Sequence, residues 1–292
     1  MFHAEFRATT IGGQPADLGS FAAQARADSH WTSVSLSDLA ATLGATVSAE
    51  RDLADVTFPV RRFKPGETLH RAGDKFSAIY VIRSGFFKTV SVDPSGAELV
   101  LAFPMGGDVI GLDGLDPGQY IADVVALDTS HVAVVPFARL AHLGREHPCV
   151  ARLLYSVFSR ELVRNHGMVW LLGTLSAEAR LAVFLLDLSE RFGRLGYSRA
   201  SFALRMTRQE TGSYLGIKLE TVSRTFSAFA AAGLIAVHRK AVTLRDLAGL
   251  RRIVEPQADD GVERRARDRR PSPTARPGRA LPRLPSFSPV AA

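Results

Sequence analysis

Cysteine is almost absent from the 292-residue sequence, in which Cys149 stands alone. One thiol cannot close a disulfide within the chain, and it cannot supply a multi-cysteine metal or iron–sulfur site. The sequence also lacks any apolar run of the roughly 18 residues that a transmembrane helix requires. Residues 1–20 have no basic segment followed by a long apolar stretch, so we expect no secretory signal, no membrane partner and a cytoplasmic location.

Positive charge is concentrated near the C-terminal end. The total is +7, but residues 261–292 hold eight arginines and two acids, which leaves only +1 on the remainder. Basicity is therefore weak support for a nucleic-acid partner, and the support must come from motifs. Residues 255–292 are rich in proline and arginine, so we expect them to be disordered, either as a solvated tail or as an arm that binds phosphates without sequence preference.

The apolar pattern, like the length, indicates about two folded domains. Residues 1–33 lack periodicity and are expected to be disordered, whereas Ser35–Asp55 has the spacing of one or two short helices. Between Phe58 and Phe137, short runs of Val, Ile and Phe alternate with glycine turns, which is typical of a small barrel or jelly roll. The expected strands include Ile79–Ile82, Phe86–Val92, Leu99–Phe103 and Ser130–Val135.

A long helix is predicted from Pro148 to about Gly173, because proline fits the first turn and apolar residues recur at helical spacing. Its apolar stripe either packs on the preceding barrel or pairs with the same helix of a second copy, and periodicity leaves both interpretations open. Another amphipathic helix is predicted over Ser176–Phe192, with Ser176 as its N-cap.

The next segment has the pattern of a helix-turn-helix. Thr207 and Glu210 are predicted to form a capping box at the start of a short helix that ends at Leu215. Gly216 supplies the turn, and a second helix is predicted from Leu219 to Ala232.

The start of this second helix exposes Glu220, Thr221, Ser223 and Arg224, at the place where a recognition helix touches base edges. Arginine can bind guanine through two hydrogen bonds, and glutamate can accept one from cytosine. Spacing alone also fits an ordinary helical hairpin with a solvated, charged face. A β-hairpin predicted over 235–244 favours the DNA-reading interpretation, because such a wing commonly contacts phosphates.

These motifs together resemble the Crp/Fnr family of transcription regulators. The resemblance spans about Phe58 to Leu244 and rests on Arg208–Gly212, Gly216, Glu220–Arg224, Lys64–Asp74, Tyr80–Gly85 and Gly107–Gly111. It implies an α+β fold with an N-terminal cyclic-nucleotide-binding-type β-roll (a jelly roll), a long dimerisation helix and a C-terminal winged helix-turn-helix. The implied boundaries are 1–33 for a disordered N-terminus, 34–147 for the β-roll with flanking helices, 148–174 for the dimerisation helix, 175–254 for the DNA-binding domain and 255–292 for the tail.

The resemblance also implies roles for single residues. Glu220, Ser223 and Arg224 are similar to the Fnr branch, which reads inverted half-sites resembling TTGAT in double-stranded DNA, so they are expected to read bases. The residues expected to contact phosphates are Thr207, Arg208, Thr221, Arg239 and Lys240. Those expected to join a homodimer are Val150, Leu153, Leu154, Val157 and Phe158. RNA polymerase is a further implied partner.

Sensing is where the sequence departs from well-known members of the family. Residues 111–125 hold three aspartates and no Arg or Lys, so a cyclic AMP phosphate would meet like charge there. The N-terminal region has no cysteine, and Ala133 stands where the β-roll would supply a cluster ligand. We therefore expect neither cyclic AMP nor an iron–sulfur cluster as a cofactor. Cys149 is either a small buried apolar group or a redox-sensitive thiol.

Two rival classes of protein remain to be weighed. A jelly-roll enzyme of the cupin type needs clustered metal ligands, but residues 58–137 contain only His70 and His131. A β-roll that regulates another activity needs an effector domain, and no segment is left unassigned to form one. The sequence therefore predicts a DNA-binding regulator that is not an enzyme.

Overall fold

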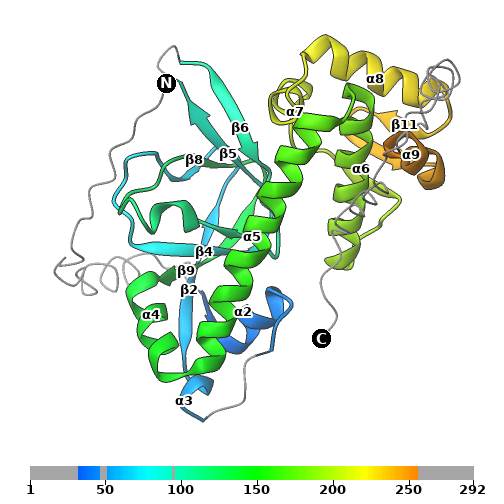
Figure 1. Cartoon of the computed structure of the whole chain (residues 1–292). Helices are drawn as coiled ribbons and strands as arrows, with labels where there is room; N and C mark the ends of the chain where they lie inside the picture. Colours follow the sequence, from blue (N-terminus) through cyan, green and yellow to red (C-terminus); the bar gives the residue numbers. More distant parts are fainter. Residues whose placement is uncertain (1–31, 47–50, 94–95, 256–292) are drawn as a thin grey trace, which may run out of the picture. The chain divides into compact units, whose positions relative to one another are not determined.

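The computed structural model describes residues 32–46, 51–93 and 96–255, and the chain divides into two compact units. Of the described residues, the first unit comprises 32–46, 51–88 and 104–158, and the second comprises 89–93, 96–103 and 159–255. Each unit combines helices with strands (Figure 1). The two segments expected to be disordered lie outside the described residues, except at their inner ends, where Thr32 and Ser33 belong to a strand and Glu255 caps a helix.

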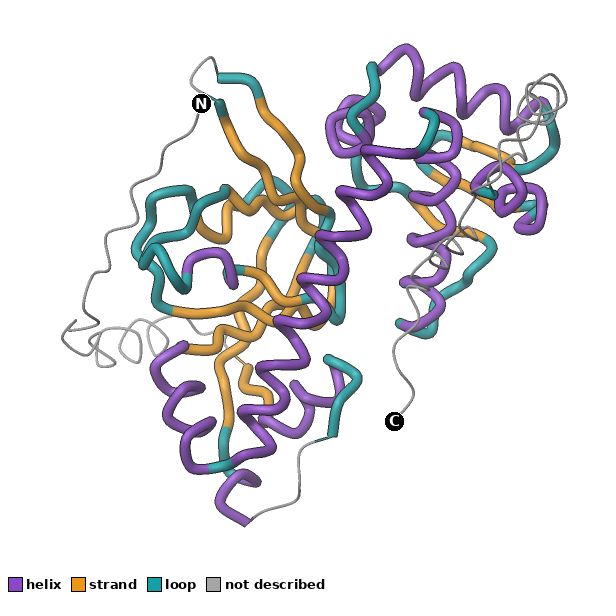
Figure 2. The backbone as a smooth tube through the Cα atoms, in the orientation of Figure 1, coloured by secondary structure: helices purple, strands orange, loops and turns teal. Residues whose placement is uncertain are grey.

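The β-roll consists of antiparallel strands in two sheets (Figure 2). The first sheet has the order β1-β2-β9-β4-β7, and the second has the order β3-β8-β5-β6. The strands of the first sheet are β1 (Thr32–Ser35), β2 (Thr57–Phe63), β9 (Ser130–Pro136), β4 (Ala78–Ser84) and β7 (Val109–Ile110). Those of the second are β3 (Thr68–His70), β8 (Asp123–Ala126), β5 (Phe87–Val92) and β6 (Glu98–Ala102). The predicted jelly-roll class is confirmed.

Strand β4 is buried on both faces and separates two apolar clusters. Successive side chains of a strand point to opposite faces, so Ile79 and Val81 belong to one cluster and Tyr80 and Ile82 belong to the other. This double burial explains why β4 reads as a continuous apolar run rather than as an alternating pattern. The cluster around Ile79 also contains apolar side chains from helices α2 (Leu36–Thr42), α4 (Phe137–Glu146) and α5 (Pro148–Thr174).

The helical spacing over Ser35–Asp55 corresponds to two short helices, α2 and α3 (Arg51–Ala54). The hydroxyl of Ser35 caps α2 by accepting a hydrogen bond from the Asp38 amide, at 3.1 Å. Gly44 follows α2 with φ +67, a left-handed conformation that suits glycine and ends the helix. Helix α4 and the short 3₁₀ helix η1 (Leu112–Gly114) were not predicted.

Helix α5 confirms the predicted long helix, and its first half packs against the β-roll of its own chain. Val150 is fully buried and Val157 is nearly so, both within the cluster around Ile79. Leu153 and Leu154 pack on the same cluster while half-buried, and Phe158 is half-buried as well. The residues expected to join two copies therefore mostly serve the core of one copy.

The second unit is built around α6 (Ala177–Arg194), which contacts the helix-turn-helix and the last helix. The helix-turn-helix consists of α7 (Arg208–Leu215) and α8 (Leu219–Ala231), and the last helix is α9 (Leu247–Val254). A three-stranded sheet has the order β10-β12-β11, with β10 (Ser201–Ala203), β12 (Ala241–Leu244) and β11 (Ile235–His238). Strand β6 is also part of this unit, since the Val100 amide donates to the Ser213 hydroxyl of α7 at 2.9 Å.

One histidine of the β-roll is buried in an aromatic stack. The ring of His70 lies 3.8 Å from the ring of Tyr120 and 5.7 Å from that of Tyr80, measured between centroids. Only 5% of His70 is exposed, and within the described residues neither ring nitrogen makes a hydrogen bond of good geometry. Burial lowers the pKa of His70 below its ordinary 6.5, against the opposing pull of Asp113 and, more weakly, of Asp74.

This lowered pKa predicts that acid destabilises the β-roll. Below about pH 6.5, His70 binds a proton in the unfolded chain, whereas in the folded chain it does so only at lower pH. The free energy of unfolding therefore falls as the pH drops below about 6.5, and His70 does not affect it above that pH. Thermal unfolding from pH 8 to 5 should show a smaller loss for His70→Phe than for the wild type. The control is His238→Asn, which changes an exposed histidine of the wing. Equal losses for wild type and His70→Phe would contradict the prediction.

Candidate nucleic-acid interface

The interface begins at α7, whose first turn is fixed by a capping box. The Thr207 hydroxyl accepts a hydrogen bond from the Glu210 amide at 3.1 Å, and the Glu210 carboxylate accepts one from the Thr207 amide at 2.7 Å. The two side chains thus satisfy two amides that the start of a helix leaves without partners. The predicted cap is confirmed.

The turn between α7 and α8 depends on two glycines. Gly216 caps α7 in the left-handed conformation, with φ +63. A side-chain carbon on Gly212 would lie 2.6 Å from the carbonyl oxygen of Ile217, so only glycine lets the turn approach α7 this closely. Leu215 and Val222 are fully buried where the two helices meet.

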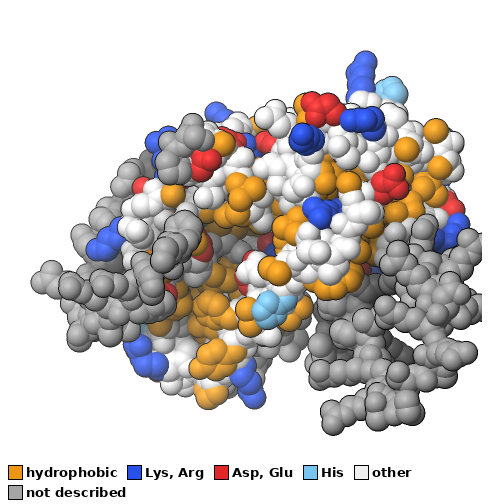
Figure 3. Space-filling view, turned by 45° about the horizontal axis from the view of Figure 1, so that its top comes forward, with side chains coloured by type: hydrophobic (Ala, Val, Ile, Leu, Met, Phe, Trp, Pro, Cys, Tyr) orange, Lys and Arg blue, Asp and Glu red, His pale blue; other side chains and the backbone are white. Residues whose placement is uncertain are grey.

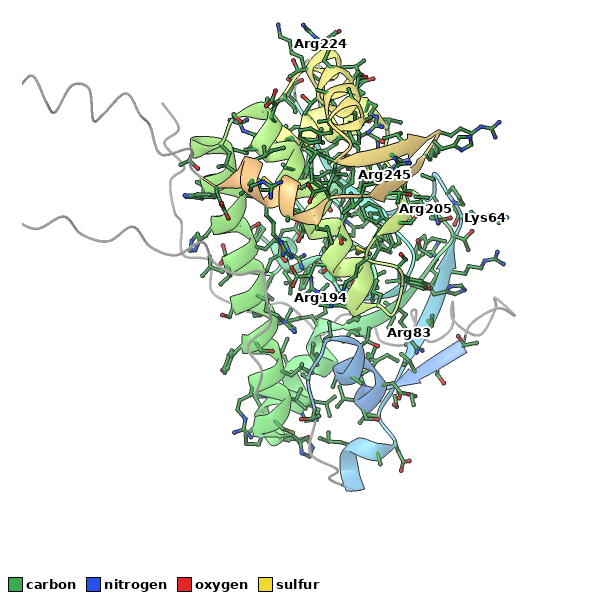
Figure 4. The ribbon with its side chains drawn as sticks, turned by 90° about the vertical axis from the view of Figure 1, so that its right-hand side faces the viewer. Lys64, Arg83, Arg194, Arg205, Arg224 and Arg245 are labelled. Atoms are coloured by element: carbon green, nitrogen blue, oxygen red, sulfur yellow. The ribbon has the colours of Figure 1, made fainter. Side chains whose placement is uncertain are left out.

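Helix α8 has a buried face and an exposed face. Val222, Thr225, Phe226 and Phe229 are buried. Glu220, Ser223 and Arg224 are exposed, and Thr221 is half-buried beside them. Figure 4 shows Arg224 projecting outward from α8. The N-cap residue Lys218 makes no side-chain cap, which leaves the first amides of α8 available to an anion such as a phosphate.

The hairpin of β11 and β12 forms the predicted wing. Its turn carries Arg239 and Lys240, both exposed. Arg239 has φ +55 and is the only non-glycine residue of the described ranges with a left-handed backbone, a conformation that costs about 1–3 kcal/mol and is enriched at functional sites. Figure 3 shows basic side chains, with some acidic ones among them, on the face that includes α8.

Arg208 is placed differently from the other residues expected to contact phosphates. Its guanidinium carbon lies 3.1 Å from the centroid of the Phe226 ring, so the side chain stacks on the inner side of α8. The side chain is half-buried, and burial lowers the pKa of Arg208 to about 10. Because this pKa is still well above neutral pH, the guanidinium remains charged. The contact is a cation–π interaction that ties the start of α7 to α8.

The sequence interpretation missed three exposed cations of this unit, Arg205, Lys218 and Arg245 (Figure 4 labels Arg205 and Arg245). The amide of Leu204 donates to the carbonyl of Lys240 at 2.8 Å, which places Arg205, just after β10, next to the wing. Lys218 is the N-cap residue of α8. Lys218 and Arg245 directly adjoin predicted motifs, the second helix and the β-hairpin over 235–244, whereas spacing gave no signal for Arg205.

Two protein families match separate parts of the chain. Residues 60–147 match the cyclic nucleotide-binding domain, and residues 179–253 match the Crp-like helix-turn-helix domain. Within the described part of the chain, no helix is long and apolar enough to cross a membrane.

One segment of the β-roll offers no cation to a phosphate, although residues 60–147 match the cyclic nucleotide-binding domain. Between Gly111 and Val125 there is no cationic side chain to pair with a phosphate. Two carboxylates of this segment instead accept hydrogen bonds from backbone amides of the β-roll. Asp113 accepts from the Ile121 amide at 3.0 Å, and Asp123 accepts from the Ala72 amide at 2.7 Å.

Regulators from several bacteria are similar to this protein over most of the chain. The transcriptional regulatory protein btr of Bordetella pertussis is 36% identical over 77% of this chain and 93% of its own length. The transcriptional activator protein FnrA of Stutzerimonas stutzeri is 38% identical over 79% of this chain and 95% of its own. The solved structure of FixK2 from Bradyrhizobium japonicum superimposes with a TM-score of 0.60 at 26% identity, covering 66% of this chain and 96% of that one. The chain therefore belongs to the Crp/Fnr family of transcriptional regulators, and it is a regulator with a helix-turn-helix DNA-binding domain rather than an enzyme.

Proposed function

We propose that the protein binds, as a homodimer, an inverted repeat of TTGAT-like half-sites in double-stranded DNA. The observation that carries this proposal is the exposed face of α8, where Glu220, Ser223 and Arg224 stand together while the opposite face is buried. Each copy inserts α8 into one of two successive major grooves, so half-site centres lie about 34 Å apart. RNA polymerase is the further partner of the DNA-bound dimer.

The side chains of the interface divide into two roles. Arg224 reads guanine, Glu220 accepts from cytosine, and Ser223 tunes the half-site. Phosphate contacts come from the wing residues Arg239 and Lys240, together with Thr207 and Thr221, and they add affinity without sequence information. We assign Arg208 to holding α8 through Phe226, because its guanidinium lies over that ring.

Dimerisation is proposed to use the outward stripe of α5. Tyr155, Leu162 and Val169 are 70%, 57% and 71% exposed, and they recur every seven residues along one helix. A seven-residue repeat of apolar side chains is the pattern by which two helices pair. The stripe is distinct from Val150 and Val157, which the β-roll core already covers.

The proposed function is tested by fluorescence anisotropy of the purified protein at about 150 mM salt, with a TTGAT-type palindrome and a scrambled duplex as probes. We expect the palindrome to bind at least about a thousandfold more tightly, as specific regulators do. The protein is assayed without any added ligand. Equal affinities for the two duplexes would reject the half-site assignment.

Two substitutions separate base reading from phosphate contact. Arg224→Ala should cost roughly 1–3 kcal/mol on the palindrome and little on the scrambled duplex. Lys240→Ala should weaken both complexes similarly and reduce the salt slope by about one. Both are measured by anisotropy titrations at several salt concentrations. Equal losses on both duplexes for Arg224→Ala would contradict its base-reading role.

The dimer stripe is tested by Leu162→Glu, which places a charge in the middle of the proposed seam. We expect the mass in light scattering to fall from about twice 31.6 kDa to that of one chain, because a buried unpaired carboxylate is costly. The matched control is Ile121→Glu, since Ile121 is also 57% exposed but lies in the β-roll. A dimer that survives Leu162→Glu unchanged would place the interface elsewhere.

A further inference from the structure

Arg180, near the start of α6, bonds to three backbone carbonyls that belong to two other parts of the second unit. Its Nη2 donates to the carbonyl of Leu172 at 2.7 Å, and its Nε donates to that of Leu175 at 3.0 Å. Its Nη1 donates to the carbonyl of Leu215 at 3.0 Å. One side chain therefore joins the end of α5 to the end of α7.

These carbonyls need partners from outside their own helices. The last four carbonyls of a helix have no amide to accept from, and a cation near them is favourable. Leu172 lies in the last turn of α5, and Leu215 is the last residue of α7. The planar guanidinium offers donors in several fixed directions, which an ammonium group on a flexible stem cannot reproduce.

The same contact lies against the turn of the helix-turn-helix. A side-chain carbon on Gly216 would lie 3.4 Å from Nη1 of Arg180 and 3.4 Å from Cδ2 of Leu172. The turn before α8 thus packs directly on the arginine and on the last turn of α5. A change in the direction of α5 relative to α7 would break at least one of the three hydrogen bonds.

We propose that Arg180 is a positioning residue that fixes the angle between the end of the dimerisation helix and the helix-turn-helix, and that it thereby sets the half-site separation that the dimer accepts. The inference rests on the proposed function, because half-site separation has meaning only for a dimer on an inverted repeat. Arg180 itself touches no base in this role. It acts by fixing the orientation of α8 relative to the dimer axis.

The test compares binding of three palindromes by anisotropy, using the full-length protein. One duplex has the spacing that the wild type prefers, and the other two have one base pair added or removed at the centre. Each change moves one half-site by about 3.4 Å and roughly a tenth of a turn. The measured quantity is the ratio of the dissociation constants for altered and preferred spacing.

In Arg180→Lys we expect this ratio to fall by about tenfold, because hydrogen bonds to a charged group correspond to factors of that size in an equilibrium constant. Preference for the palindrome over a scrambled duplex should persist, since the base-reading residues are intact. The control is Arg194→Ala, which removes an exposed arginine from the same helix and should keep the wild-type ratio (Figure 4 labels Arg194). A merely structural role for Arg180 would weaken all duplexes equally and leave the ratio unchanged.

An unchanged ratio in a folded, selective Arg180→Lys protein overturns the inference and leaves the proposed function standing. A wild type that does not prefer the palindrome rejects the proposed function instead. If Arg180→Lys does not fold, Arg180→Gln retains amide donors and replaces it in the same measurement. Failure of both variants to fold would assign Arg180 to the stability of the unit, and this outcome also overturns the inference.

Discussion

The exposed face of α8 depends on the close crossing of α7 and α8 at Gly212. The Ile217 amide donates to the Gly212 carbonyl at 3.0 Å, and the Ile217 carbonyl occupies the space that a side chain on Gly212 would need. The turn is therefore bonded directly to the backbone of α7, and α8 can leave it in only one direction. That direction decides that Val222 points into the core and that Arg224 points away from it.

In the helix-turn-helix, the features that depend on residues close together in the sequence were predictable. The capping box joins Thr207 to a residue three positions further on, and Gly216 is needed where the backbone turns left-handed. The burial pattern of α8 follows from the 3.6-residue period once its start is known. Such features depend on spacing alone, so they required no knowledge of the tertiary fold.

Contacts between distant residues could not be predicted in the same way. The start of the first helix of the motif predicts a phosphate contact for Arg208, but its side chain meets Phe226, eighteen positions away, on the inner side of α8. Helix α5 carries two apolar stripes, one through Val150 and Val157 and one through Leu162 and Val169. Spacing indicates only one apolar stripe, and the burial of Val150 and Val157 in the β-roll core is what separates the two.

Burial lowers the pKa of both His70 and Arg208, but the consequence for the charge of each side chain is different. The buried His70 and the half-buried Arg208 each lie over an aromatic ring, and burial lowers the pKa of each. The pKa of Arg208 is lowered only to about 10, so the guanidinium stays charged at neutral pH and its contact with Phe226 persists. The pKa of His70 starts at 6.5, so the same effect leaves the imidazole neutral and makes its stack sensitive to acid. Of these two contacts, only the one in the β-roll is expected to weaken in acid, below about pH 6.5, while the contact of Arg208 with Phe226 is not.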